Sequence, residues 1–132
     1  MKLIIAGSRV ITDYEILRQA VVSSGLWEEY KRTIEIVSGG AKGVDRLGEE
    51  FAWKNDLRIR RFLPDWDANG KSAGHIRNRE MGDFAKANGG CLLALWDGVS
   101  VGTRGMIEYA KKIGLRRVVF IRENGEFCMQ EE

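Results

Sequence analysis

Short runs of consecutive apolar residues alternate along the chain with longer segments in which apolar residues recur every three or four positions. Such short runs are typical of buried strands, and the second pattern is typical of helices that bury one face. The runs predict strands at residues 3–6, 34–37, 59–63, 91–96 and 118–121. The periodic segments predict helices after Asp13, from Val44, from about Ile76 to Asn88, and around Met106, with the last ending at Gly114.

Strands and helices that alternate in this way indicate a parallel sheet covered by helices on both faces. Because crossovers between parallel strands are right-handed, we expect an α/β fold of the doubly wound, Rossmann-like kind. Its five strands should follow the order 3-2-1-4-5. We expect residues 1–122 to form this single domain and residues 123–132 a C-terminal tail, either loose or a short antiparallel end. The polar stretch from Asp65 to Gly74 is the longest predicted loop.

The composition is that of one folded domain, but its glycine content is unusual. The chain has 132 residues, of which 44% are hydrophobic and 30% charged, an ordinary mixture for a globular domain. It has 16 glycines and one proline, whereas glycine usually makes up about 7% of residues. Many of these glycines follow the first, second and fourth predicted strands: Gly7, Gly39, Gly40, Gly43, Gly98, Gly102 and Gly105.

The three loops after these strands have the composition of an anion site. They are Gly-Ser-Arg at 7–9, Ser-Gly-Gly-Ala-Lys-Gly-Val-Asp at 38–45, and Asp-Gly-Val-Ser-Val-Gly-Thr at 97–103. Glycine lets backbone N–H groups approach a phosphate, a helix N-terminus adds partial positive charge, and hydroxyls donate further hydrogen bonds. No loop matches the GxGxxG or GxxxxGK[ST] fingerprint. If the glycines only formed tight turns, the hydroxyls beside them would have no explanation: Ser8, Ser38, Ser100 and Thr103.

In an open parallel sheet, ligands bind outside the carboxyl ends of the strands, where the strand order reverses. We therefore expect the three loops to converge on one ligand. The predicted phosphate- and ligand-binding residues of these loops are Gly7, Ser8, Arg9, Ser38, Gly39, Gly40, Lys42, Gly43, Asp45, Asp97, Ser100, Gly102 and Thr103. Asp45 and Asp97 are candidates for holding ribose hydroxyls, although Asp45 is equally explained as a favourable charge at a helix N-terminus.

The long polar loop and the helix after it supply further charges. Arg77 is expected in the first turn of that helix, where its charge opposes the helix dipole, so that a ligand or a local partner is needed. Lys71 either closes over a phosphate or is simply solvated. Trp66 and Trp96 are candidates for stacking on a base, whereas Trp27 and Trp53 are expected to pack in the core.

Four segments, taken in order, resemble one known group of proteins. They are residues 7–9, 38–45, 76–81 (Ile-Arg-Asn-Arg-Glu-Met) and 96–103. Together they resemble the YspA-like, cpYpsA-related branch of the SLOG superfamily, over about residues 2–121. This superfamily of Rossmann-like proteins includes the LONELY GUY cytokinin-activating enzymes, the DNA-processing protein DprA (Smf) and ligand-sensing domains of bacterial defence systems.

The resemblance implies that a nucleotide or nucleotide-derived small molecule is bound or sensed over the glycine loops, often by a homodimer. It places Arg77 near the phosphate or ribose, and we add Asn78 of the same segment to the ligand-binding residues. Neither a cofactor nor a metal is expected. The expected location is cytoplasmic, because no segment is long and apolar enough to span a membrane and no signal peptide is evident. Cys91 is expected to be buried and Cys128 exposed.

Two alternatives stay open at this point. One is a phosphoribohydrolase that cleaves the N-glycosidic bond of nucleoside 5′-monophosphates, with Arg77, Asp97 and Glu108 as candidate catalytic residues. The LONELY GUY enzymes use the glutamate of Pro-Gly-Gly-x-Gly-Thr-x-x-Glu, but Met106 stands at that position here and Glu108 lies two residues further on. The other is binding of single-stranded DNA through the basic segment 58–61, which the small formal charge of +2 disfavours.

Overall fold

The structure is a computed structural model that describes residues 1–130. Its strands are β1 (Lys2–Gly7), β2 (Glu35–Ser38), β3 (Arg58–Arg61), β4 (Cys91–Trp96), β5 (Arg116–Glu123) and β6 (Glu126–Gln130). Its helices are α1 (Tyr14–Ser23), α2 (Leu26–Tyr30), α3 (Val44–Lys54), α4 (Trp66–Asn69), α5 (Ala73–Ala87) and α6 (Val101–Lys112). Two short 3₁₀ turns complete the list, at Lys31–Thr33 and Gly70–Ser72.

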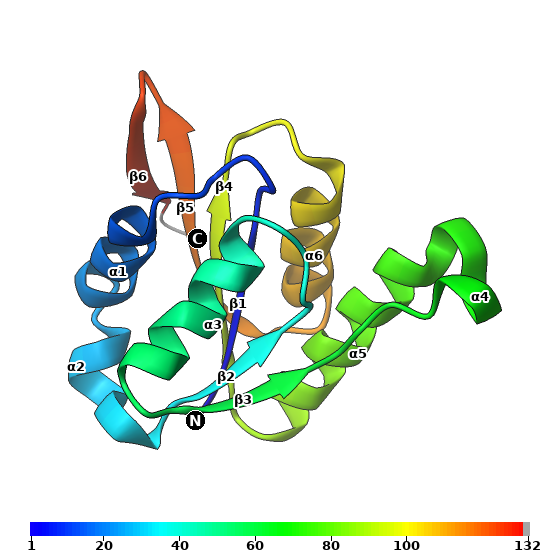
Figure 1. Ribbon diagram of the computed structural model, residues 1–132, viewed down its shortest axis with the longest axis horizontal. Helices are drawn as coiled ribbons and strands as arrows, with labels where there is room; N and C mark the ends of the chain where they lie inside the picture. Colours follow the sequence, from blue (N-terminus) through cyan, green and yellow to red (C-terminus); the bar gives the residue numbers. More distant parts are fainter. Residues whose placement is uncertain (131–132) are drawn as a thin grey trace.

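The strands form one sheet in the order β3-β2-β1-β4-β5-β6, which confirms the predicted order for the first five (Figure 1). These five are parallel to one another. In the centre of the sheet, Leu3 of β1 pairs with Cys91 of β4 and Ile36 of β2. The strand order therefore reverses between β1 and β4, and their carboxyl ends open toward the loops that begin at Gly7 and Asp97.

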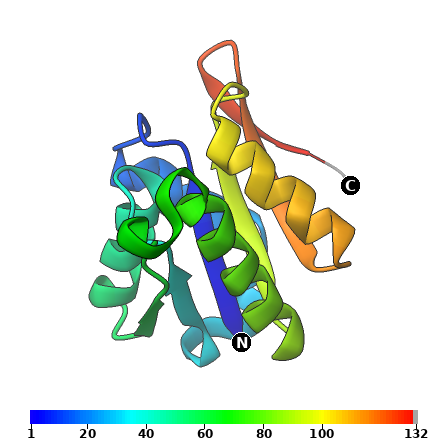
Figure 2. The ribbon, with the colours of Figure 1, turned by 90° about the vertical axis from the view of Figure 1, so that its right-hand side faces the viewer.

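Each central strand buries both of its faces, and the two faces belong to different apolar layers. Leu3 and Ile5 of β1 join the layer covered by α1 and α3, whereas Ile4 and Ala6 join the layer covered by α5 and α6 (Figure 2). All four residues are buried. This alternation has the two-residue period of a strand, and it explains why the strands read as continuous apolar runs in the sequence.

The C-terminal segment forms the short antiparallel end, one of the two expected alternatives, and continues the sheet as far as the described residues reach. Glu123 of β5 pairs with Glu126 of β6, which runs antiparallel to it. The two residues between them, Asn124 and Gly125, have φ angles of 50° and 80°, the left-handed values that a two-residue hairpin turn requires. Asn-Gly is a typical sequence for such a turn. The residues after it are too polar and exposed to show the alternating apolar pattern of a strand.

The polar stretch 65–74 is not the long loop that its composition suggested. Asp65 caps α4 by accepting a hydrogen bond from the Ala68 N–H, at 3.0 Å, and α5 begins at Ala73, three residues earlier than expected. Arg77 therefore lies in the second turn of α5 rather than the first. In Figure 1, α4 projects from the body of the molecule at the end of α5.

One expectation about a helix end is confirmed and one about a tryptophan needs correction. Gly25 follows the C-cap residue Ser24 of α1 with a φ of 82° and donates its N–H to the Val22 carbonyl, so this glycine ends the first helix. Trp27 packs edge-on against Phe51, as expected, but Trp53 is 76% exposed and takes no part in the core. Cys91 is buried and Cys128 is exposed, as predicted. Among the helices within residues 1–130, none has the length and apolar content needed to cross a membrane.

Candidate functional site

The buried polar side chains of the described chain gather at the carboxyl edge of the sheet. Ser8 follows β1, Ser38 ends β2, Asp45 and Thr103 lie in the first turns of α3 and α6, and Asn78 lies on α5. Each is at most 9% exposed. Burying a polar group disfavours folding unless it is hydrogen-bonded. Their concentration at one edge therefore indicates a candidate binding site rather than a requirement of core packing.

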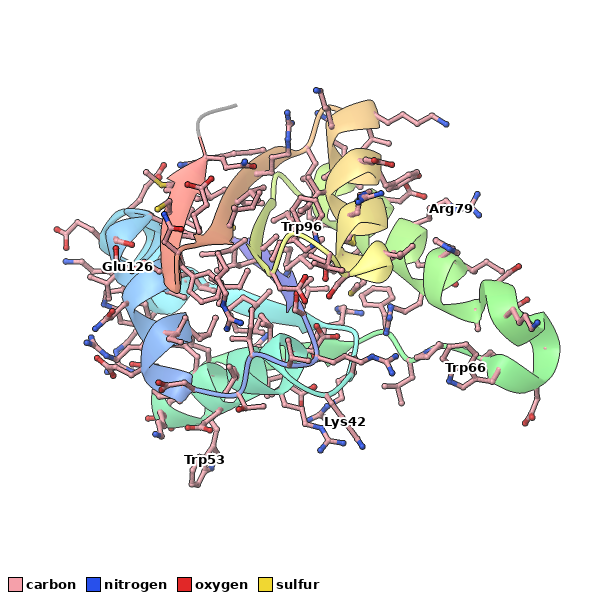
Figure 3. All side chains as sticks on the ribbon, turned by 90° about the horizontal axis from the view of Figure 1, so that it is seen from above. Lys42, Trp53, Trp66, Arg79, Trp96 and Glu126 are labelled. Atoms are coloured by element: carbon pink, nitrogen blue, oxygen red, sulfur yellow. The ribbon has the colours of Figure 1, made fainter. Side chains whose placement is uncertain are left out.

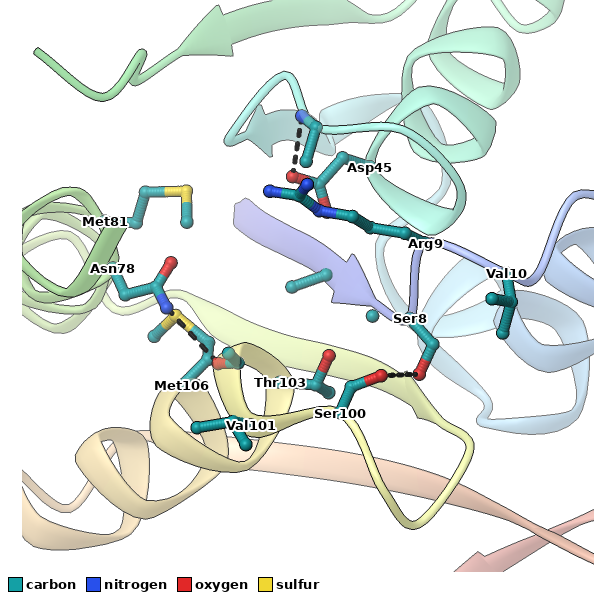
Figure 4. A pocket seen from close by; sticks show the side chains of 14 residues that line it. Ser8, Arg9, Val10, Asp45, Asn78, Met81, Ser100, Val101, Thr103 and Met106 are labelled. Carbon is teal, nitrogen blue, oxygen red and sulfur yellow. Dashed lines mark hydrogen bonds between the residues drawn. The ribbon is translucent and has the colours of Figure 1, made fainter. Parts of the chain in front are cut away.

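A cavity of about 340 Å³ opens among these side chains, and we name it the central pocket (Figure 4). It is lined by Ala6, Gly7, Ser8, Arg9, Val10, Ala41, Asp45, Asn78, Met81, Ser100, Val101, Gly102, Thr103 and Met106. Its polar groups come from loops and helix starts, and its apolar floor comes from β1, α5 and α6. A polar rim over an apolar floor suits a ligand that has both a charged and an uncharged part.

A hydrogen-bond network fixes the loop between β4 and α6. Asp97 Oδ1 accepts from the N–H groups of Val99 and Ser100, at 2.9 and 2.8 Å. The Ser100 hydroxyl lies 3.0 Å from Ser8 Oγ and 3.1 Å from Asp97 Oδ2, and Ser8 Oγ accepts from the Asp97 N–H. Burial alone would raise the pKa of Asp97, but the hydrogen bonds from Ser100 and Val99 outweigh it and hold the pKa below its ordinary value. The Asp97 carboxylate is thus occupied by its own loop.

The N-terminus of α6 faces the central pocket without a cap. Ser100, at the N-cap position, makes no side-chain capping bond, and the first turn contains no acidic residue. Thr103 is 6% exposed, yet its hydroxyl makes no hydrogen bond with any residue of the described chain, and it points into the pocket in Figure 4. The first N–H groups of a helix lack partners within the helix and attract anions. An anion bound here would accept hydrogen bonds from both the first N–H groups of α6 and the Thr103 hydroxyl.

Asp45 and Arg77 organise the glycine loop after β2. Asp45 Oδ2 accepts from the Ala41 N–H at 3.1 Å. Burial raises the pKa of Asp45 to about 6, although the Ala41 N–H and the Arg77 charge oppose the shift. The Arg77 guanidinium donates to the Gly39 carbonyl at 2.6 Å and to Asn78 Oδ1 at 2.9 Å. A Cβ on Gly39 would lie only 2.5 Å from Arg77 Nη1, so glycine is needed there for the guanidinium to pack against the loop.

Two arginines approach this loop from different elements. Burial lowers the pKa of Arg77; the Asp45 carboxylate opposes the shift, and the nearby charge of Arg9 adds to it. Arg9 follows β1, and its side chain extends across the central pocket toward Asp45 in Figure 4. The two guanidinium groups therefore repel each other, and an anion between them would relieve the repulsion.

A second cavity, of about 420 Å³, adjoins the first, and we name it the cationic pocket. It is lined by Arg9, Gly39, Gly40, Ala41, Lys42, Arg46, Leu63, Pro64, Trp66 and Arg77. Arg9 and Ala41 line both cavities. Figure 3 shows Lys42 near the start of α3 and Trp66 on α4, which projects from the body of the molecule. The predicted site is thus divided, with Gly39, Gly40, Lys42 and Arg77 on the cationic side, and Ser8, Gly102 and Thr103 on the central side.

Three of the sequence-predicted residues line neither cavity but support the site. Ser38 donates its hydroxyl to Glu49 at 2.7 Å and accepts from the Gly40 N–H at 3.1 Å. Gly43 has a φ of 79° and brings α3 against the loop after β1, where the Val44 N–H donates to the Ser8 carbonyl. Asp97 holds the loop before α6, as described above.

Other predicted residues lie elsewhere. Lys71 is exposed in the Gly70–Ser72 turn and lines neither pocket. Glu108 lines a different cavity, between α5 and α6, together with His75 and Tyr109. Trp66 lies on the rim of the cationic pocket. Trp96 instead donates its indole N–H to the Ser100 carbonyl at 3.0 Å and so supports the loop before α6.

The basic segment on β3 is partly engaged with the protein itself. Arg61 forms a salt bridge with Glu49 at 2.8 Å, and Arg60 lies over the ring of Phe84 at 4.7 Å. These interactions reduce the charge available for a nucleic-acid backbone. Sequence reasoning missed Arg46, Met81 and Met106 as lining residues. The two methionines lie on apolar helix faces that also pack the core, so no sequence pattern separates them from packing residues.

A doubly wound sheet with glycine loops and an uncapped start of α6 at its carboxyl edge is the fold of a Rossmann-like protein, with a candidate anion-binding site at that edge. The chain belongs to the YspA, cpYpsA-related SLOG family, whose family model matches residues 1–68. It is similar to the Gene 61 protein of Mycobacterium phage D29, with 33% identity over 127 aligned residues that cover 90% of this chain and 95% of the phage protein. Membership of this family indicates binding or processing of nucleotide-related molecules.

Proposed function

We propose that the protein binds a nucleotide-derived small molecule, with a phosphoryl group at the N-terminus of α6. The observation that carries this proposal is the Thr103 hydroxyl, which has no protein partner among the described residues and points into the central pocket beside uncapped backbone N–H groups. Both kinds of donor are therefore open to an acceptor in the pocket. Phosphoryl oxygens accept hydrogen bonds from both kinds of donor.

The remaining walls of the central pocket suit a nucleoside. Met81 and Met106 provide polarisable apolar surface for a base or for a sugar face. Asn78 and Asp45 stand beside them and can hydrogen-bond to sugar hydroxyls. Arg77 lies behind the glycine loop with its guanidinium anchored on Gly39, so that its charge acts on the ligand from a fixed position.

Isothermal titration with a panel of nucleotides, ADP-ribose derivatives and cyclic nucleotides tests this proposal. We expect at least one panel member to bind with a Kd below 1 mM, and Thr103→Val to weaken that binding by about tenfold, as expected for the loss of one hydrogen bond to a charged group. Thr33→Val is the matched control, because Thr33 is exposed near the amino end of β2 and donates to the Tyr30 carbonyl. Equal binding by both variants, or no binding of any panel member, would contradict the proposal.

One observation supports a second candidate function, hydrolysis of a nucleoside 5′-monophosphate to free base and ribose phosphate. Asp45 is a carboxyl group that lines the central pocket, and its pKa of about 6 lets it exchange a proton near neutral pH. Asp97, by contrast, is bonded within its own loop, and Glu108 lines another cavity. Incubation with AMP and related monophosphates, followed by chromatography for free base, tests this function. Base release by the wild type but not by Asp45→Asn would support it, and its absence at high protein concentration would exclude it.

A further inference from the structure

The cationic pocket carries more positive charge than one phosphate needs. Arg9, Lys42, Arg46 and Arg77 line it, and no carboxylate does. None of the four forms a salt bridge within the described part of the chain. Glu49 lies close enough to Arg46 to be influenced by its charge, but it is hydrogen-bonded to Arg61 and Ser38. The Asp45 carboxylate likewise acts on Arg77 from outside the pocket. The four cations therefore exceed these two nearby carboxylates, and the pocket keeps a net positive charge.

The arrangement of these side chains is a concave site rather than a scattered surface patch. They come from three separate elements, namely the loop after β1, the loop and first turns around the start of α3, and α5. Leu63, Pro64 and Trp66 close the opposite side. Trp66 and Leu63 are 55% and 67% exposed, an unusual position for large apolar side chains beside so many charges.

The cationic pocket is also continuous with the central pocket, because Arg9 and Ala41 line both. A phosphoryl group at the N-terminus of α6 would lie on one side of Arg9, and the cationic pocket lies on the other. A nucleoside monophosphate carries a charge of only about −2, which leaves the second pocket without a counterion. Further phosphoryl groups linked to the first would supply this counterion.

We propose that the cationic pocket is a second subsite, which binds additional phosphoryl groups of the ligand, and that the ligand is a nucleoside di- or polyphosphate or a molecule with the same linked phosphates. This inference rests on the proposed function of the central pocket for its nucleoside part. It adds Lys42 and Arg46 as determinants of ligand specificity, since they line the cationic pocket and not the central one.

The test compares the affinities of AMP, ADP and ATP by isothermal titration at fixed ionic strength, with inorganic tripolyphosphate as a probe without a nucleoside. The wild type is expected to bind ADP at least tenfold more tightly than AMP. The double variant Lys42→Gln/Arg46→Gln should lower the ratio of ADP to AMP affinity toward one and weaken tripolyphosphate binding at least tenfold. Thr103→Val should weaken both nucleotides by a similar factor and so preserve the ratio. Arg58→Gln/Lys111→Gln removes the same charge from exposed positions outside both pockets and should change nothing.

The outcomes separate this inference from the proposed function. If AMP and ADP bind equally well and both depend on Thr103, the proposed function stands and the second subsite is wrong. If tripolyphosphate binds in a manner that depends on Lys42 and Arg46 while no nucleotide binds, the subsite stands as an oligophosphate site and the proposed function fails. If the control double variant loses as much affinity as Lys42→Gln/Arg46→Gln, the effect is one of net charge and the subsite is wrong.

Discussion

The two edges of the sheet treat their polar groups in opposite ways. At the amino edge, charged side chains that are partly buried or exposed pair with each other, as Lys2 does with Glu35 at 2.7 Å and Arg116 with Glu29 at 3.1 Å. At the carboxyl edge, polar and charged groups surround a cavity: the Thr103 hydroxyl has no protein partner among residues 1–130, and Arg9 and Arg77 repel each other. The charges at the amino edge thus pair with each other, whereas the carboxyl edge presents polar and charged groups to a cavity.

The largest expected effect is on the pH dependence of the free energy of unfolding, to which the two edges contribute with opposite sign. The pKa of Asp45 is about 6 in the folded protein, against an ordinary value of 3.8. The folded state therefore binds more protons than the unfolded state between these values, and stability is lost as the pH rises through 6. At pH 7.5 the ionised carboxylate costs about 3 kcal/mol. Asp45→Asn is therefore expected to raise the free energy of unfolding at pH 7.5 by about 2–3 kcal/mol, with a much smaller gain at pH 4.

Glu35→Gln at the amino edge is the contrasting variant. The hydrogen bond from Lys2 lowers the pKa of Glu35, so that this carboxylate contributes stability above its ordinary pKa and loses it as the pH falls. Its removal should lower the free energy of unfolding at pH 7.5 by less than about 1 kcal/mol. Urea unfolding of both variants across pH 4–8 measures the contrast. An Asp45→Asn protein that is destabilised at every pH would show that the ionised Asp45 is structural.

The next effect concerns two glycines, one at each edge. Alanine at Gly39 would place a Cβ against Arg77 and Asp45, and the displaced guanidinium should cost at least about tenfold in ligand affinity. Gly89, between α5 and β4, has a φ of 65° but no atom within 4 Å of an added Cβ. Gly89→Ala should therefore cost about 1 kcal/mol of stability through backbone strain alone and leave ligand affinity unchanged. Titration and thermal unfolding of both variants distinguish the role of Gly39 in ligand binding from that of Gly89 in the backbone turn. An equal loss of ligand affinity in the two variants would contradict this difference.

The smallest effect is expected from two exposed arginines. Arg9→Gln removes the charge that opposes Arg77, so stability should rise by a few tenths of a kcal/mol, while anion affinity falls about threefold to fivefold. Arg116→Gln removes a salt bridge at the amino edge and should lower stability by about 0.5 kcal/mol without any change in affinity. Urea unfolding and titration of the two proteins measure these opposite responses. If Arg9→Gln lowers stability as Arg116→Gln does, Arg9 has a structural partner after all.

Much of the fold could be predicted because its determinants are local. The strand at Cys91–Trp96 has the bounds that the apolar run predicted, and Asp13 caps α1 by accepting from the Glu15 N–H. The exceptions also have local causes. The strand β6 is too polar and exposed to show a strand pattern, and α4 depends on a single capping aspartate, Asp65, in a polar stretch.

The candidate site could be predicted only as a set of residues near one edge. The glycine loops, Arg77 and Thr103 were found because backbone access to an anion requires glycine and hydroxyl residues at helix starts. Arg46 was missed, since an arginine on the exposed side of a helix has no distinguishing sequence pattern. The position of Glu108 in another cavity follows from its place around α6, which the spacing from Thr103 already indicated.

What the sequence determined by itself was the parallel sheet, its strand order and the edge at which the candidate site lies. Those features follow from apolar runs, helical periods and the handedness of crossovers, which act over short stretches of chain. The tertiary structure alone decided how the site is divided. It brings Arg77 to Gly39 and Ser100 to Ser8, pairs that are far apart in the chain, and it separates an uncapped helix start from a pocket of four cations. Such contacts depend on how whole elements pack, because the charge and polarity of a residue do not specify which distant residue it will face.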